Sequence, residues 1–233
     1  MYTLLYHGPG AGYGGHAGRG LRFGDRERNA AMNRESLAHT LTTRVLVADG
    51  AMGTYLERLM GDLDDRRRDR LPLDEPEVVR TVHRDYLAAG ADIIKTATFG
   101  ASVLGSGLEP GEPESVESII RVNEAAATIA RAEVDAAMAV DGRTRWVAGS
   151  VGPGRSAPTL GGPAYQELKA SYLPQMEGLI RGGVDVVLIE TIQDTLQAKA
   201  AIAALRNAGR ALGRTPPFIA SATMTESGRM LSG

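Results

Sequence analysis

Two acidic residues stand at the carboxyl ends of apolar runs that are typical of buried strands. Asp49 ends the run that begins at Val45, and Glu190 follows the run Val184–Ile189. Because the carboxyl ends of parallel strands meet at one edge of a sheet, we expect these carboxylates to lie close together. These carboxylates can contact a ligand, or they can cap a helix and pair with Arg or Lys, and the residues alone leave both roles open.

The residues after Asp49 complete this candidate site. Gly50, Ala51, Met52 and Gly53 follow it directly, and the small residues let backbone amides come close to a ligand. Thr98, after the second apolar run, is a further candidate contact. Hydroxyls are a weaker signal than the carboxylates because each of them is equally compatible with a turn; the others of this kind are Thr54, Ser150, Thr191 and Ser221.

An apolar run that ends in polar residues occurs five times and predicts the strands that position these groups. The segments are Val45–Asp49, Ile93–Phe99, Trp146–Pro153, Val184–Thr191 and Pro217–Thr225, the last with its core at Phe218–Ala222. Helical periodicity separates them. This alternation predicts a parallel α/β fold with its site at the carboxyl ends of the strands.

The intervening segments predict five helices. The expected ranges are 55–60, 76–89, 114–137, 165–181 and 195–207, with Asp74 and Asp194 as start signals and Pro174 kinking or splitting the fourth. The charge run Asp62–Arg70 is expected to be a solvated loop. His83 is expected on the flank of the second helix, without a functional role.

Five strand–helix units favour an incomplete (β/α)₈ TIM barrel, because a complete one typically takes about 250 residues and the units here occupy only Thr43–Gly233. An unclosed barrel would leave its first and fifth strands as open edges, which favour association. The alternative is an open, doubly wound five-stranded sheet. No G-x-G-x-x-G joins a strand to a helix, so a dinucleotide site is not indicated.

Composition excludes several functions. The net charge of −2 gives no argument for a nucleic-acid or membrane partner, and no apolar run approaches the roughly 20 residues that span a bilayer. A cytoplasmic protein is therefore expected. The absence of cysteine excludes disulfides and thiolate metal sites. Residues 1–42 are expected to be a disordered or wrongly assigned extension, Gly-rich up to Asn29, in which His7 and His16 lack partners at ligand spacing.

Several motifs together resemble the homocysteine-binding barrel of the homocysteine S-methyltransferase family, which cobalamin-dependent methionine synthases also contain. The segments are DGAMGT, LDEPEVVRTVHRDYLAAGADIIKTATF, VAGSVGP, GGVDVVLIETIQDTLQAKAA and SATMTESGRMLSG, and the last is closer to the methionine-synthase branch. The resemblance implies that residues 43–233 form the amino-terminal part of that barrel. It also implies homocysteine as substrate, zinc and cobalamin as cofactors, and folate and cobalamin modules downstream. Asp49 and Glu190 would then hold the amino acid part of homocysteine.

The sequence departs from the family pattern in two ways. The family binds zinc through three cysteines on later strands, and this chain has none, so no residue is assigned a metal or catalytic role. Lys95 and Ala97 also stand where the family usually has Glu and Asn. The isolated chain is therefore expected to be inactive. Two alternatives stay open: a non-catalytic binding fragment, and an unrelated α/β enzyme with acid–base chemistry at Asp49 and Glu190.

Overall fold

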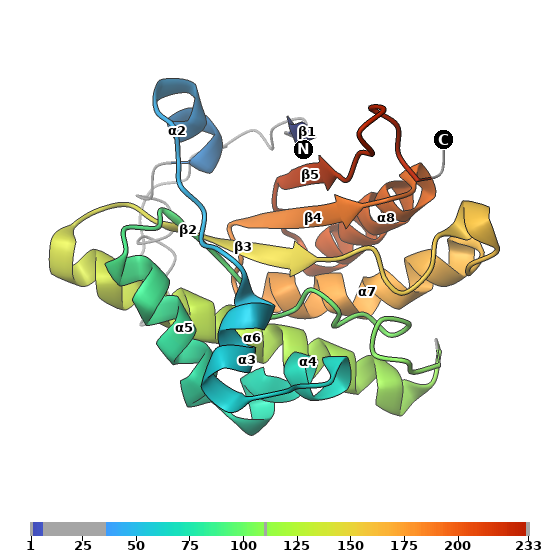
Figure 1. Ribbon diagram of the computed structural model, residues 1–233, viewed down its shortest axis with the longest axis horizontal. Helices are drawn as coiled ribbons and strands as arrows, with labels where there is room; N and C mark the ends of the chain where they lie inside the picture. The colour runs from blue at the N-terminus through green and yellow to red at the C-terminus, as the bar shows by residue number, and fades with distance from the viewer. Residues whose placement is uncertain (1, 7–35, 110, 232–233) are drawn as a thin grey trace, which may run out of the picture.

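The computed structural model describes residues 2–6, 36–109 and 111–231, and its centre is one five-stranded sheet (Figure 1). The strand order is β1-β5-β4-β3-β2. Neighbours from β2 to β5 run parallel, whereas β1 pairs antiparallel with β5. The strands are β1 (Tyr2–Tyr6), β2 (Ile93–Lys95), β3 (Trp146–Val151), β4 (Val186–Ile192) and β5 (Phe218–Ala222).

Most helices connect the parallel strands and form a layer under the sheet in Figure 1. Their bounds are α3 (Met52–Met60), α4 (Asp65–Asp74), α5 (Pro76–Ala88), α6 (Pro113–Asp141), α7 (Tyr165–Arg181) and α8 (Thr195–Leu212). A further helix, α2 (Leu37–Thr43), lies above the sheet in this view. A short 3₁₀ turn, Pro158–Leu160, precedes α7.

The two faces of the sheet have separate cores, because successive side chains of a strand point to opposite sides. Ile94 and Val147 face the layer of connecting helices, together with Tyr172 of α7. Ile93 and Trp146 face the other side, where Leu37 of α2 packs. The described connections between parallel strands therefore lie on one face, as in the wall of a barrel. The doubly wound alternative, which needs connecting helices on both faces, does not fit them.

The amino-terminal region is more structured than expected at two places. Tyr2–Tyr6 forms β1, which covers the edge of β5 that an incomplete barrel was expected to leave open. Leu37 begins α2, whose N-cap is Ser36. β1 lies in the range 1–42, and α2 begins in it, although this range was expected to be a disordered or wrongly assigned extension. Residues 7–35, which include His7, His16 and all eight glycines of the range 1–42, lie outside the described residues.

The prediction of a regular first strand at Val45–Asp49 is wrong. Val45–Asp49 runs parallel to β2, but only one bridge forms, between Ala48 and Ile93. Val45 and Val47 are 86% and 59% exposed, so the segment is not a buried strand. Among the described residues no strand lies on its other side, which leaves these side chains in solvent.

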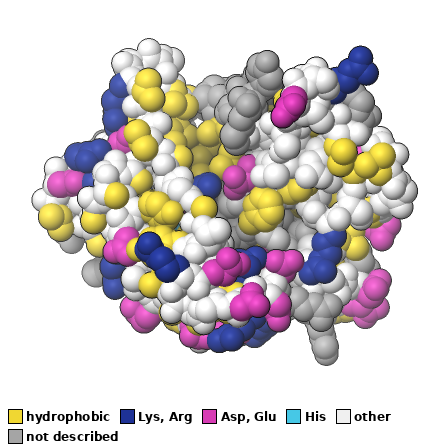
Figure 2. Space-filling model, in the orientation of Figure 1, with side chains coloured by type: hydrophobic (Ala, Val, Ile, Leu, Met, Phe, Trp, Pro, Cys, Tyr) yellow, Lys and Arg dark blue, Asp and Glu magenta, His cyan; other side chains and the backbone are white. Residues whose placement is uncertain are grey.

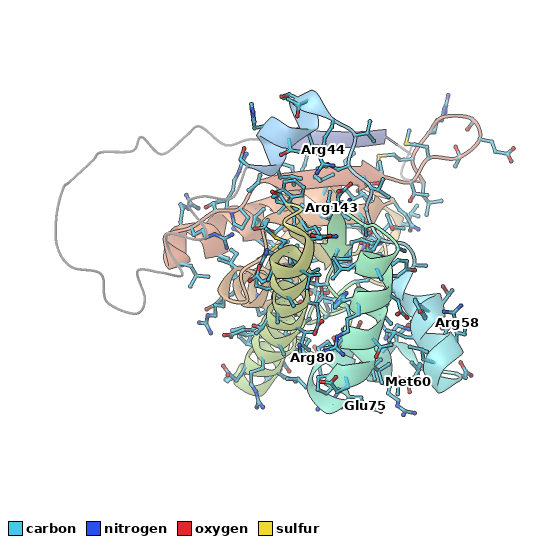
Figure 3. All side chains as sticks on the ribbon, turned by 90° about the vertical axis from the view of Figure 1, so that its left-hand side faces the viewer. Arg44, Arg58, Met60, Glu75, Arg80 and Arg143 are labelled. Carbon is cyan, nitrogen blue, oxygen red and sulfur yellow. The ribbon has the colours of Figure 1, made fainter. Side chains whose placement is uncertain are left out.

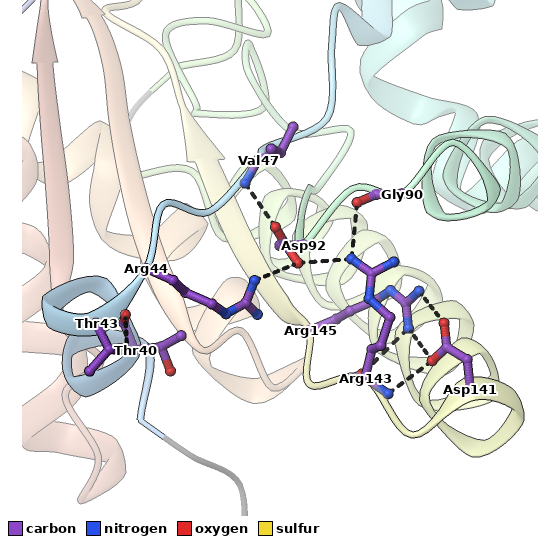
Figure 4. A network of polar contacts seen from close by, with 9 residues as sticks. All are labelled: Thr40, Thr43, Arg44, Val47, Gly90, Asp92, Asp141, Arg143 and Arg145. Carbon is purple, nitrogen blue, oxygen red and sulfur yellow. Dashed lines mark hydrogen bonds and ion pairs between the residues drawn. The ribbon is translucent and has the colours of Figure 1, made fainter.

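A polar network at the amino end of β2 holds this extended segment in place (Figure 4). The carboxylate of Asp92 accepts hydrogen bonds from the backbone N–H of Val47 at 3.0 Å, from Arg44 at 3.3 Å and from Arg143 at 3.2 Å. The Asp92 side chain is only 5% exposed. This end of the segment is thus fixed by charge-assisted hydrogen bonds rather than by a ladder.

The charge run Asp62–Arg70 is not a loop, because its last six residues belong to α4. The side chain of Asp64 caps the helix by accepting from the N–H of Arg67. Arg70 pairs with Asp74 at i,i+4, and Leu71 is fully buried. Buried Leu71 and the Asp64 cap therefore stabilise a helix in a segment whose charges suggested a solvated loop. α5 then begins at Pro76, with Glu75 rather than Asp74 as its N-cap.

Two other helices also differ from the expectation. α7 continues through Pro174 without a break. α8 extends past Gly209 to Leu212, and Gly213 with φ of 70° ends it. Its start is as predicted: Asp194 caps it in a reciprocal capping box with Gln197.

His83 is a core residue rather than a flank residue. It is fully buried on α5, and neither ring nitrogen has a hydrogen-bond partner. Burial lowers the pKa of its imidazole to about 4, so the ring is neutral at physiological pH. On the same helix, Arg80 faces α6 and bonds Glu133 at 2.9 Å, which joins the two helices (Figure 3).

No helix in the described part of the chain is long and apolar enough to cross a lipid bilayer.

Candidate functional site

A cavity of about 180 Å³ opens at the carboxyl ends of the parallel strands. Its walls come from α3, α4, the exit of β2 and the ends of β3 and β4. Figure 2 shows basic and acidic side chains side by side in a hollow of the surface, bordered by hydrophobic side chains. The lining residues are Met52, Gly53, Leu56, Arg68, Asp69, Lys95, Thr96, Ala97, Thr98, Phe99, Ser150 and Glu190.

Asp49 lies beside the cavity, at the end of the extended segment. Its side chain is 1% exposed. Oδ2 accepts a hydrogen bond of 2.9 Å from the backbone N–H of Lys95, whereas Oδ1 has no hydrogen-bond partner. Burial raises the pKa of this carboxyl to about 7, against the lowering effect of Lys95, and the nearby Glu190 raises it further. The carboxyl is therefore poised to ionise fully when a cation arrives.

Glu190 lies inside β4, at an irregularity in the pairing of β4 with β5. The register shifts between Ile189 and Ile192, and Thr191 has a positive φ of 60°. Oε1 of Glu190 accepts a hydrogen bond of 2.6 Å from the hydroxyl of Ser150. A non-glycine residue in the left-handed region costs about 1–3 kcal/mol, and such strain is commonly found at functional sites.

Lys95 links the two carboxylates. Its ammonium nitrogen is 3.9 Å from Oδ1 of Asp49 and 3.9 Å from Oε2 of Glu190. The structure thus brings together Asp49 and Glu190 as the sequence predicts. It also places between them the cation of Lys95, a residue that stands where the family usually has Glu.

The Thr98 hydroxyl lies in the wall but is committed to the protein. Its Oγ1 donates to the carbonyl of Ser150 at 2.7 Å and is 2.6 Å from Oγ1 of Thr96. The amide of Gln175 bonds the carbonyl of Thr98 at 2.8 Å. Thr98 therefore shapes the exit of β2. Its hydroxyl proton is donated to the protein and not to a ligand.

The glycine-containing stretch places the start of α3 at the cavity. Met52 and Gly53 line it, and Ala51 is the N-cap without a side-chain hydrogen bond to the helix. The first N–H groups of a helix have no intrahelical partner and favour anions. Gly50 lies under Tyr86, and a Cβ added to Gly50 would be 2.7 Å from the Tyr86 hydroxyl. That hydroxyl donates a hydrogen bond to the carbonyl of Ala51.

Asp69 is a cavity residue that sequence reasoning missed, because α4 was expected to be a loop. It is 8% exposed, and its Oδ2 has no hydrogen-bond partner. Burial raises the pKa of this carboxyl to about 7, and the charge of Asp65 adds to the effect. The cap at Asp64 and the apolar Leu63 and Leu71 are the signals that could have placed it on a buried helix face.

The described residues do not provide a zinc site. The chain contains no cysteine, and its described part holds no group of three or more His, Asp or Glu side chains that could bind a metal ion. The carboxylates of the cavity thus contact backbone amides, a hydroxyl and one ammonium group. This donor set suits an amino acid's charged groups better than a thiophilic metal.

Comparison with known proteins shows the family of this chain. A family model described as homocysteine S-methyltransferase matches residues 46–233. The methionine synthases of Mycobacterium leprae and Mycobacterium tuberculosis are each 39% identical to this chain over 202 residues, which is 84% of this chain and 16% of theirs. The chain therefore spans about one sixth of the length of these curated relatives.

Solved structures with a similar fold are also found. The metallated form of the homocysteine methyltransferase MmuM from Escherichia coli superposes with a TM-score of 0.64 at 25% identity, over 84% of this chain and 69% of that one. Its oxidized form gives the same TM-score at 26% identity, over 84% and 68%. Because the family model covers most of the sequence, this chain belongs to the homocysteine S-methyltransferase family.

Proposed function

We propose that this chain binds homocysteine in the cavity, as part of a methionine synthase that methylates it to methionine. The observation that carries the proposal is the pair of carboxylates of Asp49 and Glu190. Each has one oxygen that accepts no hydrogen bond, and both of these oxygens face the Lys95 ammonium beside the cavity that the start of α3 lines. Two carboxylates suit an ammonium group and free helix amides suit a carboxylate, so the arrangement fits the head of an α-amino acid.

The remaining walls suit the rest of homocysteine. The methylene groups and the thiol would lie against the apolar side of the cavity, which Leu56 and Phe99 contribute. Burial of a short apolar chain adds affinity but little orientation, so the charged head determines the binding pose. The proposal also includes a cytoplasmic location. It further includes downstream folate and cobalamin modules, which would belong to the methionine synthase as a whole.

Methyl transfer itself is not assigned to residues of this chain. In the family a zinc ion activates the thiol of homocysteine, and methylcobalamin is the donor in the synthase. The side chains described here do not fit a zinc site, and no catalytic residue is proposed among them. We therefore expect the isolated chain to bind homocysteine without converting it.

Isothermal titration calorimetry tests the binding proposal with two ligands. L-Homocysteine should bind, and 4-sulfanylbutanoate, which lacks the amino group, should bind at least about tenfold more weakly, because charge-assisted hydrogen bonds contribute about 1.5–3 kcal/mol. Asp49→Asn and Glu190→Gln should each weaken homocysteine by a similar factor.

The control for these variants is Glu226→Gln, an exposed residue in the loop after β5. It should leave the affinity unchanged. Equal affinity of the two ligands for the wild-type chain, or of the wild type and Glu190→Gln for homocysteine, would refute the proposed site.

A further inference from the structure

Lys95 occupies the position in the site that a ligand's ammonium group would need. Of the four carboxylate oxygens of Asp49 and Glu190, one already accepts from the Lys95 backbone N–H and one from the Ser150 hydroxyl. The two remaining oxygens, Oδ1 of Asp49 and Oε2 of Glu190, both face the ammonium nitrogen of Lys95 at 3.9 Å.

We propose that Lys95 is a specificity-determining residue: its ammonium group is an internal occupant of the ammonium subsite, and a ligand's amino group binds by displacing it. The inference rests on the proposed function for the identity of the natural ligand. The subsite itself, and the competition for it, follow from the chain's own side chains.

The distances indicate an occupant that can leave. Charge-assisted N–H···O hydrogen bonds are about 2.7–2.9 Å long, so at 3.9 Å Lys95 makes ion pairs without a hydrogen bond to either oxygen. Its side chain is 20% exposed, which connects it to the open cavity. A primary ammonium group that hydrogen-bonds both oxygens would therefore gain contacts that Lys95 does not make.

The other cation in the wall does not compete for this position. Arg68 donates to Glu57 at 2.6 Å, to Asp65 at 2.9 Å and to the carbonyl of Leu63 at 2.9 Å. Those partners hold its guanidinium against α3 and the start of α4. Lys95 is thus the cavity-lining cation that faces both free oxygens.

Occupation by an internal group lowers the apparent affinity for a ligand by the fraction of molecules in which the subsite is free. Replacing Lys95 by the neutral methionine, which has a similar length, should remove that competition. Lys95→Met should therefore bind L-homocysteine about tenfold more tightly than the wild type, while 4-sulfanylbutanoate should gain little. Lys199→Met, on the exposed side of α8, is the matched control and should behave as wild type.

Chemical rescue tests the subsite without homocysteine. In Lys95→Ala, propylammonium should raise the melting temperature, because it refills the space between the two carboxylates. It should do so neither in the wild type, where Lys95 is present, nor in the double variant Lys95→Ala/Glu190→Gln.

The unmodified chain gives an independent readout, since its lysines are Lys95, Lys169 and Lys199. With ¹³C at the lysine Cε, L-homocysteine should shift the Lys95 signal and leave the other two in place. This measurement remains informative if a variant at position 95 fails to fold.

The outcomes separate the two proposals. Rescue by propylammonium without any binding of homocysteine would support the internal occupant and refute the proposed function. Homocysteine could instead bind the wild type and Lys95→Met with equal affinity and leave the Lys95 signal in place. That result would support the proposed function and overturn the inference. Failure of both the rescue and the Lys95 shift would overturn the inference whatever the affinity for homocysteine.

Discussion

Asp92 and Asp49 are two buried aspartates that hold opposite ends of the same extended segment against β2. At the amino end, Asp92 accepts from Arg44, Arg143 and a backbone amide (Figure 4). Burial alone would raise the pKa of the Asp92 carboxyl, but these donors outweigh it and lower that pKa. At the carboxyl end, Asp49 has one backbone amide and a distant ammonium group, and burial raises its pKa to about 7.

The difference separates a structural carboxylate from one that is available to a ligand. The oxygens of Asp92 are satisfied by the protein, so its charge stabilises the fold. Asp49 keeps an oxygen without a hydrogen-bond partner beside the cavity, so its charge costs stability until a cation binds closely. Evolution tolerates such a cost at binding sites, where stability and function compete.

The largest expected difference between the two aspartates lies in how Asp49 makes the free energy of unfolding depend on pH. Its pKa is about 7 when folded and about 3.8 when unfolded, so the folded state holds the proton more tightly and loses stability as pH rises through this range. Asp49→Asn should abolish this loss. Relative to wild type, its free energy of unfolding should gain about 3 kcal/mol between about pH 4.5 and about pH 8.

Urea denaturation of the wild type and the variant at both pH values measures this gain. Buried His83, whose lowered pKa makes stability rise with pH over part of the same range, contributes equally to both proteins and cancels in the difference. A constant difference between the two proteins across this range would show that Asp49 is ionised in the fold like Asp92.

The matching substitution at the other end, Asp92→Asn, should have the opposite effect. It removes the charge that pairs with two guanidinium groups, and should cost about 2 kcal/mol at neutral pH. Because the folded pKa is lowered, the stabilisation is present above the unfolded pKa and is lost as pH falls through the folded pKa. The deficit of the variant should therefore shrink in acid, as followed by denaturation. A deficit that stays constant down to acid pH would contradict the pairing.

The smallest effects are expected for the two partners of Asp92. Arg44 and Arg143 are 45% and 50% exposed, and exposed ion pairs contribute about 0–1 kcal/mol. Arg44→Ala and Arg143→Ala should each lower the free energy of unfolding by less than about 1 kcal/mol. A double-mutant cycle of each with Asp92→Asn gives the coupling, and the absence of coupling would assign the stabilisation to the Val47 amide alone.

The sequence predicted those parts of the fold in which one local signal dominates. β5 has the bounds expected for its core, and β3 begins at the expected residue, because each is a short apolar run bounded by polar or turn residues. The start of α8 follows from its cap at Asp194. α4 was missed because its charges conceal buried Leu71, and Val45–Asp49 was overestimated because an apolar run does not show whether a neighbouring strand covers it.

The candidate site was predictable in its layout more than in its contacts. Strand ends converge, so the proximity of Asp49 and Glu190 followed from topology. The position of the Lys95 ammonium depends on how a long flexible side chain folds back. The burial of Asp69 depends on α4, whose range was expected to be a solvated loop. The role of these residues toward a ligand stays a prediction.

A crystal structure of the chain grown with L-homocysteine would test the central claim most directly. The account predicts that the ligand nitrogen lies about 3 Å from Asp49 Oδ1 or Glu190 Oε2, that the ligand carboxylate meets the first amides of α3, and that Lys95 has moved away. A ligand bound elsewhere, or an empty cavity at saturating homocysteine with Lys95 still between the carboxylates, would contradict it.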